Sequence, residues 1–222
     1  RLMSRGLGDV YKRQLMFREH AYGRDDFVNG LKDAKRLVYN HYKTDKESSI
    51  VHNNLKDMKD VLTYSLQYQK GAWVLHMLRN YIGEDNFRKG IRNYYKKYYN
   101  STTTTNQFKT EMEVVSGMNL DTFFDQWLYK GGNMVLDGNW KFDEKKGRIE
   151  VNLNQVQNDG YLFEMPVELG ISYNDKNLEK IQTVKLEKEK GRFYIASDSK
   201  PISIKIDPNT KLLAIWDFNE IK

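Results

Sequence analysis

The chain has 222 residues, of which 39% are hydrophobic and 13% aromatic, so it can bury a core and is not a wholly disordered protein. Cysteine is absent, which excludes disulfides and thiolate metal sites, and no apolar run reaches the roughly 18–20 residues of a membrane-spanning helix. The formal net charge is +6, but half of it lies in residues 1–14, and the rest shows no basic stripe with interleaved aromatics, so we expect no nucleic-acid partner.

The first segment, residues 1–14, reads "RLMSRGLGDVYKRQ" and has no amphipathic pattern. It resembles a translated sequencing-adapter sequence of the kind found at the ends of environmental gene fragments. We therefore predict that these residues are a non-native scar and exclude them from the fold.

Residues 15–133 have the spacing of helices. The stretch "LMFREHAYG" predicts a helix that ends at Gly23. Residues 25–42 predict a second helix with one buried face, formed by Phe27, Leu31, Ala34 and Val38. Residues 43–65 are polar and irregular and predict a long loop with a short helix at 55–62.

Four further helices are predicted before residue 133. Residues 66–82 form the most apolar one, with Ala72, Leu75, Leu78 and Ile82 on one face. Residues 84–99 are acidic first and basic last, as the helix dipole favours. Residues 104–117 begin with a capping box, Thr104 with Gln107, and end at Gly117. Residues 119–132 predict a short helix packed through Leu120, Phe123, Phe124, Trp127 and Leu128.

Residues 134–222 alternate between apolar and polar positions, as strands do. The segment 148–153 places Ile149, Val151 and Leu153 on one face, and "DEKKG" before it closes a hairpin from residues 139–142. "NDG" at 158–160 predicts a tight turn. The remaining strands are predicted at 166–173, 181–187, 192–196, 201–206 and 212–218. About seven short strands predict an antiparallel β-sandwich.

A search for catalytic motifs finds few. No two of the four histidines (His20, His41, His52 and His76) are four residues apart, so H-E-x-x-H is absent, and each is interpreted as a surface or packing residue. No phosphate-binding loop or nucleophile elbow occurs. Four carboxylates on short helices are interpreted as exposed or capping groups: Glu111, Glu113, Asp121 and Asp125.

The pattern Y-x-K-G-A-x-x-L-x-M-L-R at residues 68–79 resembles the helix that carries the catalytic tyrosine in aminopeptidase N-type zinc metalloaminopeptidases, the gluzincin family that includes leukotriene hydrolase. The stretch "TTTNQFKTEMEVVSGMNLDTFFDQWLYKGG" is similar to the family's next conserved segments, and "LMFREHAYGRDDF" to the segment behind its zinc helices. The resemblance covers roughly residues 15–222. Met134 departs from it, because the family usually has proline there.

The resemblance implies an α+β multidomain fold. Residues 15–133 would be the α-helical C-terminal half of a thermolysin-like catalytic domain, and residues 134–222 the antiparallel β-sandwich domain that follows it. The family's zinc ligands and its amine-binding G-x-M-E-N motif lie N-terminal to the segment that resembles this chain. We therefore expect a C-terminal fragment that holds no zinc and is inactive by itself.

In the intact enzyme, the resemblance implies that zinc polarises a water molecule and the peptide carbonyl, and that a glutamate takes the proton of the water. Tyr68 would then donate its phenolic hydrogen to the oxyanion of the tetrahedral intermediate during removal of N-terminal residues from peptides. From residue type alone, without the resemblance, Tyr68 is interpreted as an ordinary tyrosine whose ring packs while its hydroxyl reaches water. Gln69, Lys70 and Gly71 receive no chemical role.

An alternative interpretation is a non-catalytic helical and β-sandwich module that binds a protein or peptide. The unbroken upstream reading frame would distinguish the two, because only the peptidase requires H-E-x-x-H there. The location is left open between periplasm or cell surface and cytoplasm, since any targeting signal would lie upstream. Substrate preference and oligomeric state are not indicated by the residues.

Overall fold

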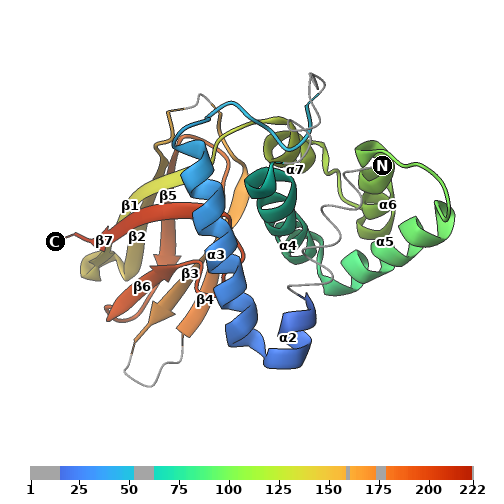
Figure 1. Ribbon diagram of the computed structural model, residues 1–222. Helices are drawn as coiled ribbons and strands as arrows, with labels where there is room; N and C mark the ends of the chain where they lie inside the picture. Colours follow the sequence, from blue (N-terminus) through green and yellow to red (C-terminus); the bar gives the residue numbers. More distant parts are fainter. Residues whose placement is uncertain (1–15, 53–62, 159–160, 174–178, 222) are drawn as a thin grey trace. The chain divides into compact units, whose positions relative to one another are not determined.

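The computed structural model describes residues 16–52, 63–158, 161–173 and 179–221, and the chain divides into two compact units, residues 1–132 and 133–222 (Figure 1). The predictions for residues 1–14 and for a short helix at 55–62 lie outside the described residues, as does most of the predicted turn at 158–160.

The described elements of the first unit are all helical. They are α2 (Met16–Tyr22), α3 (Arg24–Tyr42), η2 (Tyr64–Lys70), α4 (Gly71–Ile82), α5 (Glu84–Lys97), α6 (Thr105–Ser116), α7 (Asp121–Phe124) and η3 (Asp125–Tyr129). The predicted stops at Gly23 and Gly117 are confirmed, and Gly83 follows the end of α4. Gly23, Gly117 and Gly83 have φ of 89°, 69° and 87°, a region in which a residue with a Cβ is strained. None of the described helices is long and apolar enough to cross a bilayer.

Two helices bury the faces that their apolar spacing predicts. On α3 the predicted face is at most 2% exposed, and on α4 at most 6% exposed. Trp73 on α4 is fully buried, and its Nε1 donates to the carbonyl oxygen of Leu31 on α3 at 2.9 Å. The two helices are therefore held together by buried apolar side chains and by one specific hydrogen bond.

The start of α6 has the predicted capping box. The backbone N–H of Gln107 donates to Thr104 Oγ1 at 3.3 Å, and the backbone N–H of Thr104 donates to Gln107 Oε1 at 2.8 Å. Two N–H groups that the helix itself cannot satisfy thus find acceptors.

Removal of this cap gives a stability prediction. Thr104→Ala is expected to lower the free energy of unfolding by about 1 kcal/mol, because the Gln107 N–H loses its acceptor. Urea unfolding of the 222-residue chain, followed by far-ultraviolet circular dichroism, measures the change. Thr104→Ser keeps a hydroxyl and is the control, so an equal loss in both variants would contradict the role of the cap.

The second unit consists of two sheets (Figure 1). Its strands are β1 (Met134–Asp143), β2 (Arg148–Gln155), β3 (Met165–Ser172), β4 (Glu179–Leu186), β5 (Lys190–Ala196), β6 (Ser203–Ile206) and β7 (Ala214–Glu220). One sheet has the order β5-β2-β1-β7 and the other β4-β3-β6. The hairpin between β1 and β2 turns through Glu144–Lys146, with Gly147 in the left-handed region at φ 56°.

The α+β fold class is confirmed, and so are the inward positions of β2, since Ile149, Val151 and Leu153 are all 0% exposed. One pairing differs from the predicted antiparallel arrangement: β1 and β7 are parallel, with Met134 opposite Ala214. The other pairings of the two sheets are antiparallel. The parallel pair arises because β7 follows β6 of the other sheet and returns to the free edge of β1.

Candidate active site

Tyr68 lies on η2, directly before α4, and its side chain is half-buried. Its ring lies 5.9 Å from the ring of Tyr64, which is 59% exposed, at an interplanar angle of 31°. Within the described part of the chain, the Tyr68 hydroxyl makes no hydrogen bond. Among the described residues, the ring thus has an aromatic neighbour while the phenolic O–H has no acceptor.

The first turns of this helical segment differ from the continuous α-helix predicted over residues 66–82. Residues Tyr64–Lys70 form a π-helix, in which the N–H of Gly71 reaches back five residues to the carbonyl oxygen of Leu66. A π-turn inserts an extra residue and changes the direction of the side chains that follow, and such turns are frequent at functional sites. The side chains of residues 64–70 are therefore spaced around the helix axis differently from those of α4.

Lys70, to which no chemical role was assigned from the residues alone, is fully buried. Its Nζ donates to Tyr42 Oη at 2.8 Å and to the carbonyl oxygens of Gly132 and Lys130 at 3.3 Å and 3.4 Å. The same Nζ lies 4.8 Å from the centre of the Tyr42 ring. A buried ammonium is tolerated only with such partners, so Lys70 links η2 to the end of α3 and to residues 130–132.

The backbone around these partners is closely packed. The Tyr42 hydroxyl donates to the carbonyl oxygen of Ser48 at 3.0 Å, and the N–H of Val51 donates to that of Leu128 at 2.9 Å. A Cβ added at Gly131 would lie 2.5 Å from the carbonyl oxygen of Lys46. Only glycine allows this approach. The loop after α3 and the residues after η3 therefore pack closely around the Lys70 ammonium, and this packed region is called the Lys70 joint below.

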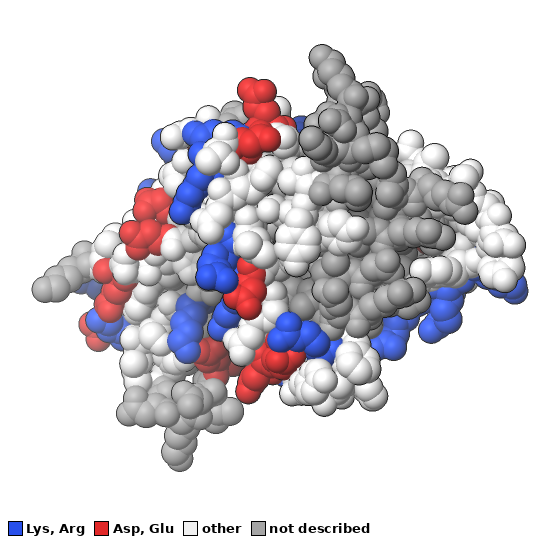
Figure 2. All heavy atoms as spheres, viewed as in Figure 1, with Lys and Arg blue, Asp and Glu red and all other residues white. Residues whose placement is uncertain are grey.

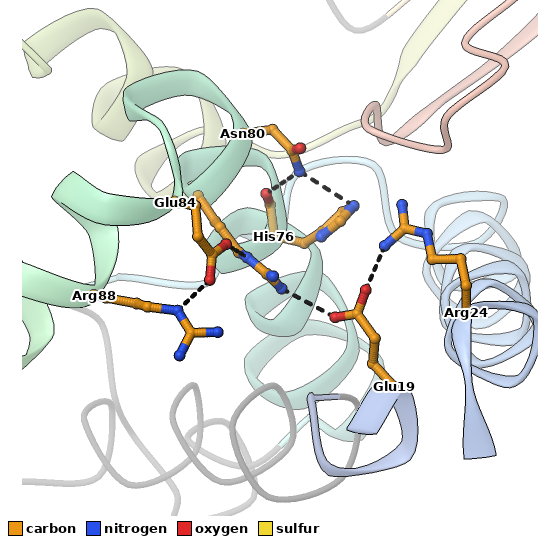
Figure 3. Close-up of polar contacts among 7 residues, drawn as sticks. Glu19, Arg24, His76, Asn80, Glu84 and Arg88 are labelled. Carbon is orange, nitrogen blue, oxygen red and sulfur yellow. Dashed lines mark hydrogen bonds and ion pairs between the residues drawn. The ribbon is translucent and has the colours of Figure 1, made fainter. Parts of the chain in front are cut away.

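A network of ion pairs joins α4 to α2, α3 and α5 (Figure 3). Arg79 pairs with Glu84 and, at 3.3 Å, with Glu19, while Arg24 pairs with Glu19 at 2.8 Å and Arg88 with Glu84. On the face that Figure 2 shows, acidic and basic side chains are interspersed over α3. These contacts hold the helices together without contributing a group to Tyr68.

Glu84 makes this network sensitive to pH. Burial raises the pKa of Glu84, but the hydrogen bonds and positive charges of Arg79 and Arg88 together lower it by more. The pKa of Glu84 therefore lies below its ordinary value of 4.5. A lowered pKa in the folded state stabilises the fold above pH 4.5, and this stabilisation is lost as the pH falls through the folded-state pKa.

Glu84→Gln is therefore expected to destabilise the helical unit at pH 7 by up to about 1 kcal/mol, since the carboxylate is partly exposed, and by less near about pH 3. Urea unfolding at the two pH values measures this difference. Asp85→Asn, next to it in the same helical turn, is the control and should show a smaller pH-dependent loss. A Glu84→Gln loss that is equal at both pH values would contradict the linkage.

The remaining histidine and carboxylate predictions have mixed outcomes. His76 is a packing residue, as predicted, with its ring 5.3 Å from Phe27 and 5.6 Å from Trp73. The prediction for Glu111 was wrong: it is 5% exposed and pairs with Lys97 at 2.5 Å. The α6 face that carries it packs against α5, which the spacing of two isolated carboxylates could not indicate. Asp121 is exposed and pairs with Lys109, as a surface carboxylate does.

No group of three or more histidine, aspartate and glutamate side chains among the described residues could hold a metal ion. The described residues therefore do not fit a zinc site. The site that they do form consists of Tyr68, the π-turn that carries it and the buried Lys70 joint behind that turn.

Comparison with known proteins places the chain in a family. The model of the peptidase family M1 domain matches residues 12–127, more than half of the chain and including Tyr68. Probable aminopeptidase 2 of Sulfurisphaera tokodaii is 31% identical over 142 residues, which are 64% of this chain and 17% of that protein. Aminopeptidase N of Lactococcus lactis is 26% identical over 104 residues, 46% of this chain and 12% of that protein.

The fold has a close counterpart among solved structures. The crystal structure of Legionella pneumophila aminopeptidase A in complex with aspartic acid matches 97% of this chain and 24% of its own, with a TM-score of 0.78 at 17% identity. The chain spans less than a fifth of the length of the two curated relatives above. With the family model matching residues 12–127 and the aminopeptidases matching in sequence, the chain belongs to peptidase family M1, a family of metallopeptidases.

Proposed function

We propose that this chain is part of a zinc-dependent metalloaminopeptidase that removes N-terminal residues from peptides, and that Tyr68 is the residue through which it takes part in the reaction. The family match and the aminopeptidase names of its relatives support the reaction class. Zinc is general in the family, where it supplies Lewis-acid chemistry. No described residues of this chain fit the ion, so the role proposed for the chain is confined to its own side chains.

The single observation that carries the role of Tyr68 is a phenolic hydroxyl without a partner among the described residues, on a π-turn between buried neighbours. Peptide hydrolysis passes through a tetrahedral intermediate in which the carbonyl oxygen becomes an oxyanion. A neutral phenol can donate a hydrogen bond to that oxygen without giving up its proton. A donor held in place before the reaction stabilises the developing charge without reorganisation at that moment.

The test is the Tyr68→Phe variant of the complete gene product, assayed with an aminoacyl reporter. Loss of turnover with unchanged zinc content supports the proposal, because phenylalanine keeps the ring and removes only the donor. The 222-residue chain alone serves as the negative control and is expected to give no turnover. Unchanged turnover in Tyr68→Phe would remove this residue from the mechanism.

A further inference from the structure

The buried Lys70 joint lies two residues after Tyr68 in the chain. The three oxygens that accept from its Nζ come from distant segments: the end of α3 at Tyr42, and residues 130 and 132 beyond η3. An ammonium carries three N–H donors, so it can donate to oxygens of more than one segment at once. A neutral side chain of the same length could fill the space, but it could not donate to the three oxygens.

The other side of Tyr68 is anchored too. Gln67 is 7% exposed, and its Nε2 donates to the carbonyl oxygen of Ile50 at 3.3 Å. Gln69, the next residue, is also buried. Tyr68 is therefore the half-buried member of a π-turn whose flanking side chains are buried, and Lys70 donates to oxygens of two other segments.

We propose that Lys70 is a positioning residue for Tyr68: its ammonium holds the last residues of η2 against Tyr42 and residues 130–132 and so sets where the Tyr68 hydroxyl lies. The inference rests on the proposed function of Tyr68 and assigns a role to a residue that does not itself touch the substrate. Hydrogen bonding to a reacting oxygen depends steeply on position, and a displacement of about 1 Å can cost on the order of 10²-fold in rate.

The test is a double-mutant cycle in the complete gene product. Lys70→Met keeps the length of the stem and removes the donors, and we expect kcat to fall by roughly 10- to 100-fold with little change in KM. In the Tyr68→Phe background the same substitution should leave kcat almost unchanged, because no hydroxyl remains to be positioned. Amide hydrogen exchange of peptides covering residues 64–71 should become faster in Lys70→Met, which reports the loosened turn without an activity assay.

Lys97→Met is the matched control, because it removes another ammonium of the helical unit, paired with Glu111 and away from η2. It should leave kcat unchanged. If Lys70→Met does not fold, Tyr42→Phe replaces it in the cycle, since this change removes one acceptor of Nζ and keeps the ring beneath it.

The outcomes separate this inference from the proposed function. An equal loss of kcat in both backgrounds would mean that Lys70 acts through general stability, and the positioning role would be overturned while Tyr68 keeps its function. An unchanged kcat in Lys70→Met, with Tyr68→Phe inactive, would overturn it in the same way. If Tyr68→Phe itself keeps full turnover, the proposed function and the role of Lys70 both fail.

Discussion

Replacing Tyr68 with phenylalanine is expected to lower kcat on an aminoacyl reporter by roughly 10²–10³-fold, the loss typical when one oxyanion donor is removed. KM should change little, because a hydrogen bond that forms only as charge develops on the carbonyl oxygen does not contribute to substrate binding. Steady-state kinetics of the complete gene product measures both constants. A rise in KM with unchanged kcat would show that Tyr68 binds the ground state and is not an oxyanion donor.

Tyr64→Phe is the control for this experiment. Tyr64 lies beside Tyr68 on the same π-helix, with its ring 5.9 Å away, but its side chain is largely exposed. Loss of its hydroxyl should leave kcat within about twofold, because surface substitutions away from a reacting group have small effects. The Tyr68→Phe variant should also unfold at the same urea concentration as the wild type, since its hydroxyl has no hydrogen-bond partner among the described residues.

The elements of this fold could largely be predicted because they depend on local signals. The apolar spacing of Phe27 and Leu31 fixes one face of α3, and Thr104 with Gln107 fixes the start of α6. Strand β2 shows its inward face through simple alternation. Each of these signals lies within a few residues of the structure that it specifies, so a single sequence is enough to find it.

The features that the sequence did not predict depend on residues far apart in the chain. The acceptors of Lys70 at residues 130 and 132 are 60 and 62 positions away, and no local pattern marks a lysine as buried by distant carbonyl oxygens. The parallel pairing of β1 with β7 likewise joins residues 134–140 to residues 214–220. The resemblance singled out Tyr68, but it did not indicate the π-turn that carries it.

Trp73 on α4, five residues after Tyr68, is expected to affect stability and not the reaction. Trp73 is 0% exposed and hydrogen-bonded to Leu31, and its ring meets the edge of His76. Trp73→Ala is expected to lower the free energy of unfolding of the helical unit by about 3–5 kcal/mol, because it leaves a large cavity between α3 and α4. Far-ultraviolet circular dichroism during urea unfolding of the 222-residue chain measures the loss.

Trp73→Phe separates the two contributions to this loss. The smaller ring keeps most of the apolar volume and removes the Nε1 donor to Leu31, so a loss of about 1–2 kcal/mol is expected. If both variants lost the same free energy, the hydrogen bond would outweigh the packing and the cavity argument would be wrong. Because Trp73 and Tyr68 lie five residues apart on one continuous segment, their opposite responses distinguish the part of the segment that maintains the fold from the part proposed to act in the reaction. Trp73→Ala should reduce stability, whereas Tyr68→Phe should reduce only turnover.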